Sequence, residues 1–128
     1  MGFTHQALFT VLLVFMLFSG HTYTEECAGC PIPANLSDPM VQKYAQDAVA
    51  EIKKETNHMS LYYLEEIINA TVQVVAGILY HYELIVLRTD LYEGLILREK
   101  DLCNVDVWVK EWEDFENITV NSCERQFN

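Results

Sequence analysis

The chain has 128 residues, of which 8 are basic and 19 acidic, so its formal net charge is −11. This length fits one small domain. Because no basic stripe runs along the sequence, the composition argues against nucleic acid and anionic membrane surfaces as partners, and the acidic excess mainly serves solubility.

The N-terminus carries an almost unbroken apolar run, Ala7–Phe18. The run is too short to span a bilayer, and no stop-transfer pattern follows it. We interpret it as the core of a secretory signal peptide over residues 1–24, with cleavage after Ser19 or Thr24; the alternative is a buried core helix. The expected product is a secreted, extracellular domain over residues 25–128.

A short irregular arm, Glu25–Ser37, follows the signal peptide; its two prolines exclude a helix, and we expect it to be mobile. Ser37 or Asp38 then caps a helix that has Pro39 in its first turn and ends near Thr56-Asn57. Apolar residues recur on one side of this helix, as expected for packing against a core. They are Val41, Tyr44, Ala45, Ala48, Val49 and Ile52.

Beyond the helix, the pattern becomes that of β-strands. In one of them the apolar residues occupy the even positions, which predicts one buried face. The segment Arg88–Asp101 is charged and contains Gly94, so we predict a connecting loop there. One helix packed on an antiparallel sheet is an α+β domain, and we expect a monomer. The predicted strands span residues 61–72, 78–87, 102–109 and 118–122, with a turn over 110–116.

The pentapeptide Gln73–Gly77 lies between two of these strands, so it should form the tip of a β-hairpin. Turn residues are usually polar, but this tip carries three apolar residues. Gly77 at its end can adopt the positive φ that a tight reversal needs. An apolar tip is covered either by its own fold or by a partner. The alternative is a buried strand that happens to end in glycine.

Four cysteines in a small secreted chain imply disulfides. The sequence alone allows three pairings. We favour Cys103–Cys123, because each would end a strand of one predicted hairpin, which leaves Cys27 and Cys30 as the second pair. A redox role for this Cys-x-x-Cys pair is disfavoured, because it lies in a proline-rich arm and not at a helix start. We expect the two cysteines either to form a short local disulfide that stiffens the arm or to join two chains.

Three Asn-x-Ser/Thr sequons also agree with secretion, and they begin at Asn35, Asn69 and Asn117. Such triplets also occur by chance, so each one alone leaves its occupancy open. Asn69 lies close to the predicted tip, so a glycan there would matter for any interaction of that tip. His58 and His81 have no neighbouring nucleophile motif, and no spacing typical of metal ligands occurs, so we predict neither an enzyme nor a cofactor.

The pentapeptide matches the Gln-x-Val-x-Gly motif of the cystatins, which inhibit papain-like cysteine proteases, and the chain resembles a secreted type 2-like cystatin. Gly29, in Ala-Gly-Cys-Pro, matches the glycine of the family's N-terminal arm, although alone it would be an ordinary loop glycine. Trp112 matches the tryptophan of the second loop, where Glu111 replaces the usual proline and should loosen the turn. Cys103–Cys123 matches the family's C-terminal disulfide.

The resemblance implies a cystatin-like fold, in which a single helix packs on a curved antiparallel sheet. It also implies reversible, non-covalent occlusion of the clefts of cathepsin-type proteases. Asn57 stands where some cystatins bind legumain, which makes legumain a second candidate partner. The rival hypothesis is a secreted cystatin-fold protein without inhibitory activity, which Glu111 and the arm cysteines favour. The implied protease-binding residues are Gly29, Gln73, Val74, Val75, Ala76, Gly77 and Trp112.

Overall fold

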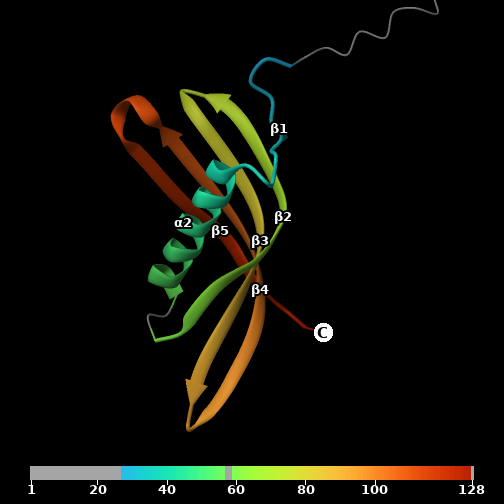
Figure 1. Cartoon of the computed structure of the whole chain (residues 1–128), viewed down its shortest axis with the longest axis vertical. Coiled ribbons are helices and arrows are strands. Elements are labelled where there is room, and N and C mark those ends of the chain that lie inside the picture. Colours follow the sequence, from blue (N-terminus) through green and yellow to red (C-terminus); the bar gives the residue numbers. More distant parts are fainter. Residues whose placement is uncertain (1–26, 57–58, 128) are drawn as a thin grey trace, which may run out of the picture.

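The computed structural model describes residues 27–56 and 59–127, so the expected signal peptide, residues 1–24, lies outside the described part. Five antiparallel strands form one curved sheet in the order β1-β2-β3-β4-β5, and a single helix lies across one face (Figure 1). No helix within the described part is both long and apolar enough to span a bilayer. The elements are β1 (Ile32–Pro33), α2 (Pro39–Thr56), β2 (Leu61–Val75), β3 (Gly77–Tyr92), β4 (Leu95–Lys110), a 3₁₀ turn (Glu111–Glu113) and β5 (Phe115–Gln126).

Helix α2 forms where the sequence predicts it. Its cap is Asp38, whose Oδ1 accepts a hydrogen bond from the backbone N–H of Met40 at 2.9 Å. All six residues of the predicted apolar stripe are buried. The Tyr82 hydroxyl on β3 donates a hydrogen bond to the Val41 carbonyl at 2.8 Å, which fixes the first turn of the helix against the sheet.

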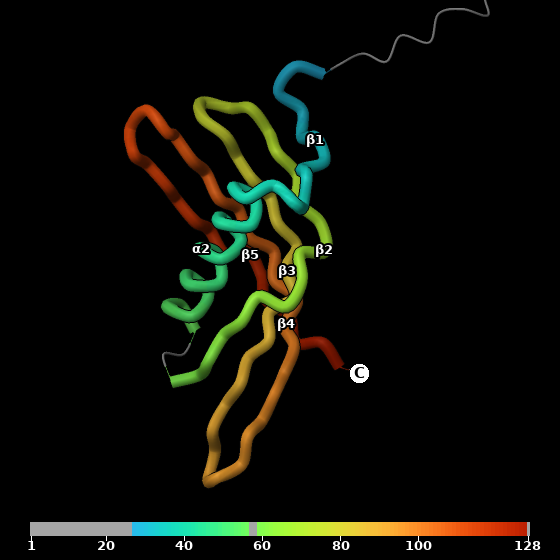
Figure 2. The backbone as a smooth tube through the Cα atoms, viewed as in Figure 1, coloured from blue at the N-terminus to red at the C-terminus, as the bar shows by residue number. Residues whose placement is uncertain are grey.

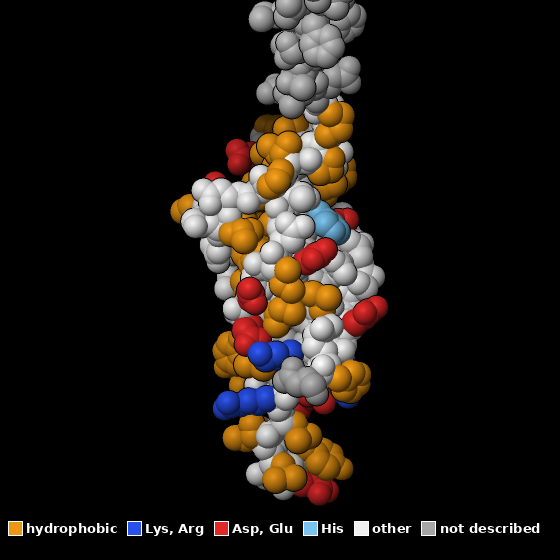
Figure 3. All heavy atoms as spheres, turned by 90° about the vertical axis from the view of Figure 1, so that its right-hand side faces the viewer, with side chains coloured by type: hydrophobic (Ala, Val, Ile, Leu, Met, Phe, Trp, Pro, Cys, Tyr) orange, Lys and Arg blue, Asp and Glu red, His pale blue; other side chains and the backbone are white. Residues whose placement is uncertain are grey.

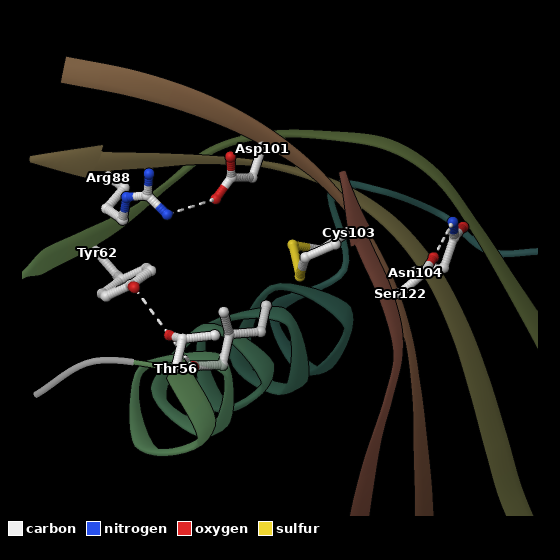
Figure 4. Close-up of a disulfide and its surroundings, with 9 residues drawn as sticks. Thr56, Tyr62, Arg88, Asp101, Cys103, Asn104 and Ser122 are labelled. Carbon is white, nitrogen blue, oxygen red and sulfur yellow. Dashed lines mark hydrogen bonds and ion pairs between the residues drawn. A yellow bond between two sulfur atoms is a disulfide. The ribbon is translucent and has the colours of Figure 1, made fainter. Parts of the chain in front are cut away.

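The core lies between α2 and alternate residues of the central strands. The predicted inner face of β3 is confirmed, since its even-numbered residues from Tyr80 to Val86 are buried. The disulfide Cys103–Cys123 joins β4 to β5 at directly paired positions. Figure 4 shows the Cys103 side chain on the side of the sheet that faces α2, where it is fully buried.

The prediction of a connecting loop over Arg88–Asp101 is wrong, because β3 and β4 continue through it as one hairpin in register. The charged residues of this segment pair across the strands: Arg88 contacts Glu99 and lies 3.6 Å from the Asp101 carboxylate (Figure 4). The reversal itself needs only Glu93 and Gly94, whose φ angles are 47° and 81°. Two successive residues with positive φ are typical of a tight hairpin turn.

The hairpin formed by residues 90–97, here called the distal hairpin, extends beyond the neighbouring strands. Pairing of β2 with β3 ends at Thr89, and pairing of β5 with β4 ends at Lys100. Hydrophobic side chains gather at this lower end of the molecule in Figure 3. They belong to Leu91, Tyr92, Leu95, Ile96 and Leu97, all of which are exposed.

Candidate functional site: three segments at one end of the sheet

The pentapeptide does form the tip of a hairpin, but the strands run further into it than predicted. Val75 pairs directly with Gly77, so Ala76 alone makes the reversal. The side chain of Val74 is 69% exposed and that of Val75 is 39% exposed. The tip therefore presents small apolar side chains to solvent, held by the two strands behind them.

Gly77 allows the first hairpin to lie against the second. Its φ is 102°, and a β-carbon added there would lie 2.3 Å from the Val109 carbonyl oxygen. Every other residue would therefore force the start of β3 away from β4. A large residue there, as in Gly77→Trp, would therefore displace the backbone as well as change the surface of the tip.

Trp108 holds the tip from the outer face of the sheet, the face away from α2. Its indole N–H donates a hydrogen bond to the Ala76 carbonyl at 2.9 Å. The indole also packs edge-on against Phe115, with 5.4 Å between ring centroids, and the Lys110 ammonium lies 4.4 Å from its centroid. The sequence alone predicts no such role for Trp108. The alternation of β4 could have indicated the outer face, but not the partner.

The second loop is the 3₁₀ turn after β4. Trp112 at its centre is 68% exposed, and its indole has no hydrogen-bond or ring partner among the described residues. Glu111, which replaces the family's proline, begins the turn. Asp114, at φ 50°, ends it and donates its N–H to the Glu111 carbonyl at 3.4 Å. A backbone hydrogen bond therefore closes the turn without proline, and the looseness expected from the sequence stays a prediction.

The N-terminal arm is anchored, so the prediction that it is mobile is wrong for its paired part. β1 pairs with β2, and the Ala34 N–H donates to the Ala70 carbonyl at 2.8 Å. The structure contains the Cys27–Cys30 disulfide, which closes a short turn. Gly29 in this turn has a φ of 83°, and a β-carbon there would lie 3.6 Å from the Val74 carbonyl oxygen. The arm thus lies beside the first hairpin.

These three segments lie at one end of the sheet, which we call the loop end: residues 27–30, 73–77 and 111–113. Ile78 pairs with Val109, which places both hairpin tips at the same end, and Figure 2 shows the arm beside the first of them. The distal hairpin lies at the opposite end. Six of the seven predicted protease-binding residues therefore come from two adjacent segments, and Trp112 comes from the neighbouring tip.

The loop end has an acidic surround. Glu111, Glu113 and Asp114 flank Trp112, and the Lys110 ammonium lies 4.0 Å from the Glu113 carboxylate. Glu116 lies on β5, two residues after Asp114, and its pKa is raised. The causes are burial, a hydrogen bond to the Asp47 carboxyl of α2 and repulsion from the charge of Asp47.

The remaining predicted residues are the candidate legumain residue and the three sequon asparagines. Asn57, the candidate legumain residue, lies outside the described residues, so its role stays a prediction. All three sequon asparagines are exposed. Asn35 Oδ1 accepts a hydrogen bond from the Ser37 N–H at 3.0 Å, while Asn69 and Asn117 lie on β2 and β5.

The sequence matches the model of the cystatin domain over residues 29–123, which is most of the chain. The chain belongs to the cystatin family. The members of this family are protease inhibitors and not enzymes, and membership suggests inhibition of cysteine proteases.

Cystatins of two animals align over most of this chain. It is 30% identical to a cystatin of Oncorhynchus mykiss over an alignment of 107 residues, and the match covers 75% of this chain and 82% of the relative. It is 25% identical to cystatin cpi-1 of Brugia malayi over an alignment of 121 residues, and the match covers 86% of this chain and 95% of the relative.

Solved cystatin structures share the fold. The crystal structure of Al-CPI has a TM-score of 0.66 and 29% identity, and the match covers 77% of this chain and all of the other. The crystal structure of dimeric human cystatin F has a TM-score of 0.67 and 25% identity, and the match covers 86% and 98% of the two chains. The predicted cystatin fold is therefore confirmed.

Proposed function

We propose that this cystatin is a secreted, reversible and non-covalent inhibitor of papain-like, cathepsin-type cysteine proteases, and that the loop end enters the protease cleft. One observation carries the proposal: the arm, the first hairpin tip and the turn that carries Trp112 lie at one end of the sheet. Side chains at opposite ends could not occupy one cleft together. The extracellular location follows from the predicted signal peptide and agrees with the two disulfides.

The loop end suits occlusion because it is preorganised. The hydrogen bond from Trp108 to Ala76 and the close contact of Gly77 with Val109 hold the first tip before any partner arrives. A preorganised surface loses little conformational entropy on binding. The small side chains of Val74 and Val75 allow close approach of a protease wall, while Trp112 supplies the large aromatic surface that often dominates binding energy.

The acidic surround of Trp112 bears on the choice of partner. A protease with a basic rim around its cleft would be attracted by the carboxylates of residues 111, 113 and 114. The association rate should then fall as salt is added, because these exposed charges are screened within about 10 Å at 0.1 M salt.

The proposal is tested by titrating active-site-quantified papain and a cathepsin L-type protease with the purified protein. Stoichiometric loss of protease activity is expected. The variant Val75→Asp should inhibit weakly while keeping its fold, because it places a charge on the tip. Its matched control, Leu95→Asp, places the same charge on a more exposed apolar residue of the distal hairpin and should inhibit like the wild type.

Two outcomes would count against the proposal. No inhibition by a correctly folded protein would favour the rival, a secreted cystatin-fold protein without inhibitory activity. Equal loss of inhibition in Val75→Asp and Leu95→Asp would show that the loop end is not the contact surface. A parallel titration of legumain tests the separate prediction for Asn57.

A further inference from the structure

A hollow of about 320 Å³ opens on the outer face of the sheet, next to the loop end. Its walls combine apolar surface with polar groups that hydroxyl-rich ligands could use. It is lined by Val75, Leu79, Asp106, Trp108, Asn117 and Thr119. Of these lining residues, only Val75 is also a proposed protease contact.

The hollow contains a complete glycan acceptor. Asn117 and Thr119 are the first and third residues of a sequon, and both are exposed on the same face of β5. Asn117 is paired directly with Trp108 on β4. The β-carbons of directly paired residues lie roughly 5 Å apart, so the first group attached to Asn117 would contact the indole of Trp108.

Phe115 extends the aromatic surface along β5. It precedes Asn117 by two residues, which places it on the same face of the strand, and its ring packs edge-on against Trp108. A pyranose ring has one face made mostly of C–H groups, and covering aromatic surface with that face removes both from water. Asp106, which contacts His81, adds a carboxylate that accepts hydrogen bonds from sugar hydroxyls.

We propose that Asn117 carries an N-linked glycan whose first N-acetylglucosamine packs in this hollow against Trp108 and Phe115; the inference rests on the proposed secretion. The attachment transfers an oligosaccharide from a lipid-diphosphate donor. The Asn117 amide nitrogen bonds to C1 of the sugar, the bond from C1 to the phosphate oxygen breaks, and the amide loses one proton. The glycan then covers Trp108 and leaves Trp112 free.

The other two sequons lack this setting and serve as internal controls. Asn69 is paired with Glu83, a charged residue that offers no aromatic face. The Asn35 side chain is engaged in its own turn through the Ser37 N–H. A sugar on either should therefore stay solvated and contribute little to the stability of the fold.

The test uses the full chain secreted from eukaryotic cells, as wild type and as the variants Asn117→Gln and Asn69→Gln. Intact mass before and after enzymatic removal of N-glycans reports occupancy. Wild-type protein trimmed to one N-acetylglucosamine per site should melt at least about 4 °C above Asn117→Gln, a shift in the range that one modest interaction produces in a small domain. Asn69→Gln should melt within about 1 °C of the trimmed wild type.

A further variant separates sugar packing from a general effect of glycosylation. Phe115→Leu should keep the glycan. The melting temperature of its trimmed form should exceed that of Phe115→Leu/Asn117→Gln by less than the trimmed wild type exceeds Asn117→Gln. Nuclear Overhauser contacts between the first sugar and an indole are expected in the trimmed wild type.

An unmodified Asn117 overturns the inference, whether the protein is secreted or retained, and so does an equal stability loss in Asn117→Gln and Asn69→Gln. A protein that carries the packed glycan but fails to inhibit papain supports the inference while refuting the proposed function.

Discussion

Replacing Trp112 with alanine should weaken protease inhibition strongly and leave the fold almost unchanged. The side chain is 68% exposed and has no hydrogen-bond or ring partner among the described residues, so its removal should change the free energy of unfolding by less than about 0.5 kcal/mol. A loss of inhibition in Trp112→Ala would then come from lost contact with the protease and not from unfolding.

The magnitude follows from the exposed area. A tryptophan buries about 150–250 Å² when covered. With 68% of the side chain still exposed, roughly 100–170 Å² remains for a protease to cover. At about 25 cal/mol per Å² this gives about 2.5–4 kcal/mol. Since about 1.4 kcal/mol is tenfold in affinity, the inhibition constant should rise by roughly 60- to 1,000-fold.

The assay is the inhibition constant against active-site-quantified papain, with urea unfolding of each variant beside it. The matched control is Leu95→Ala, which removes apolar surface from a side chain that is 64% exposed at the other end of the sheet. It should leave the inhibition constant within about threefold of the wild type, a change below 1 kcal/mol. If Trp112→Ala and Leu95→Ala inhibit equally well, the reasoning from the loop end fails.

Three further substitutions probe the framework. Gly77→Ala should cost about 2–4 kcal/mol in urea unfolding, since its β-carbon meets the Val109 carbonyl and its φ is positive; an unchanged unfolding midpoint would contradict the close approach. Tyr82→Phe removes the hydrogen bond to α2 and should cost about 1 kcal/mol, seen as a lower melting temperature with inhibition retained. The raised pKa of Glu116 means that this group stabilises the fold below the ordinary glutamate pKa, and that this contribution is lost as pH rises through the raised value. Glu116→Gln should therefore raise stability at pH 7, by less than about 1 kcal/mol for so exposed a group, and not at pH 3; an equal effect at both pH values would refute the assignment.

Local periodicity was sufficient to predict the parts of the fold that face the core. The spacing of Val41, Tyr44 and Ile52 predicts the buried stripe of α2, and the alternation of β3 predicts its inner face. Such patterns are visible in sequence because one side of each element is consistently apolar.

Contacts set by strand register were not predictable in the same way. The roles of Gly77 and Trp108 depend on which residue of the other hairpin lies opposite, about 30 positions away in the chain. The charged segment from Arg88 onward resembled a loop because its partners lie on the paired strand. The candidate site was therefore predicted as a set of residues, while its internal support came from the structure.

The distal hairpin offers a position for attaching a label or a surface linker to this cystatin. Its turn, Glu93-Gly94, lies at the opposite end of the sheet from the arm and the two tips. Nothing is within 4 Å of a β-carbon added at Gly94, so a dye, a biotin or a surface linker attached at Glu93 has open space around it. A protein immobilised there would face its loop end, which carries the proposed protease contacts, toward the solution.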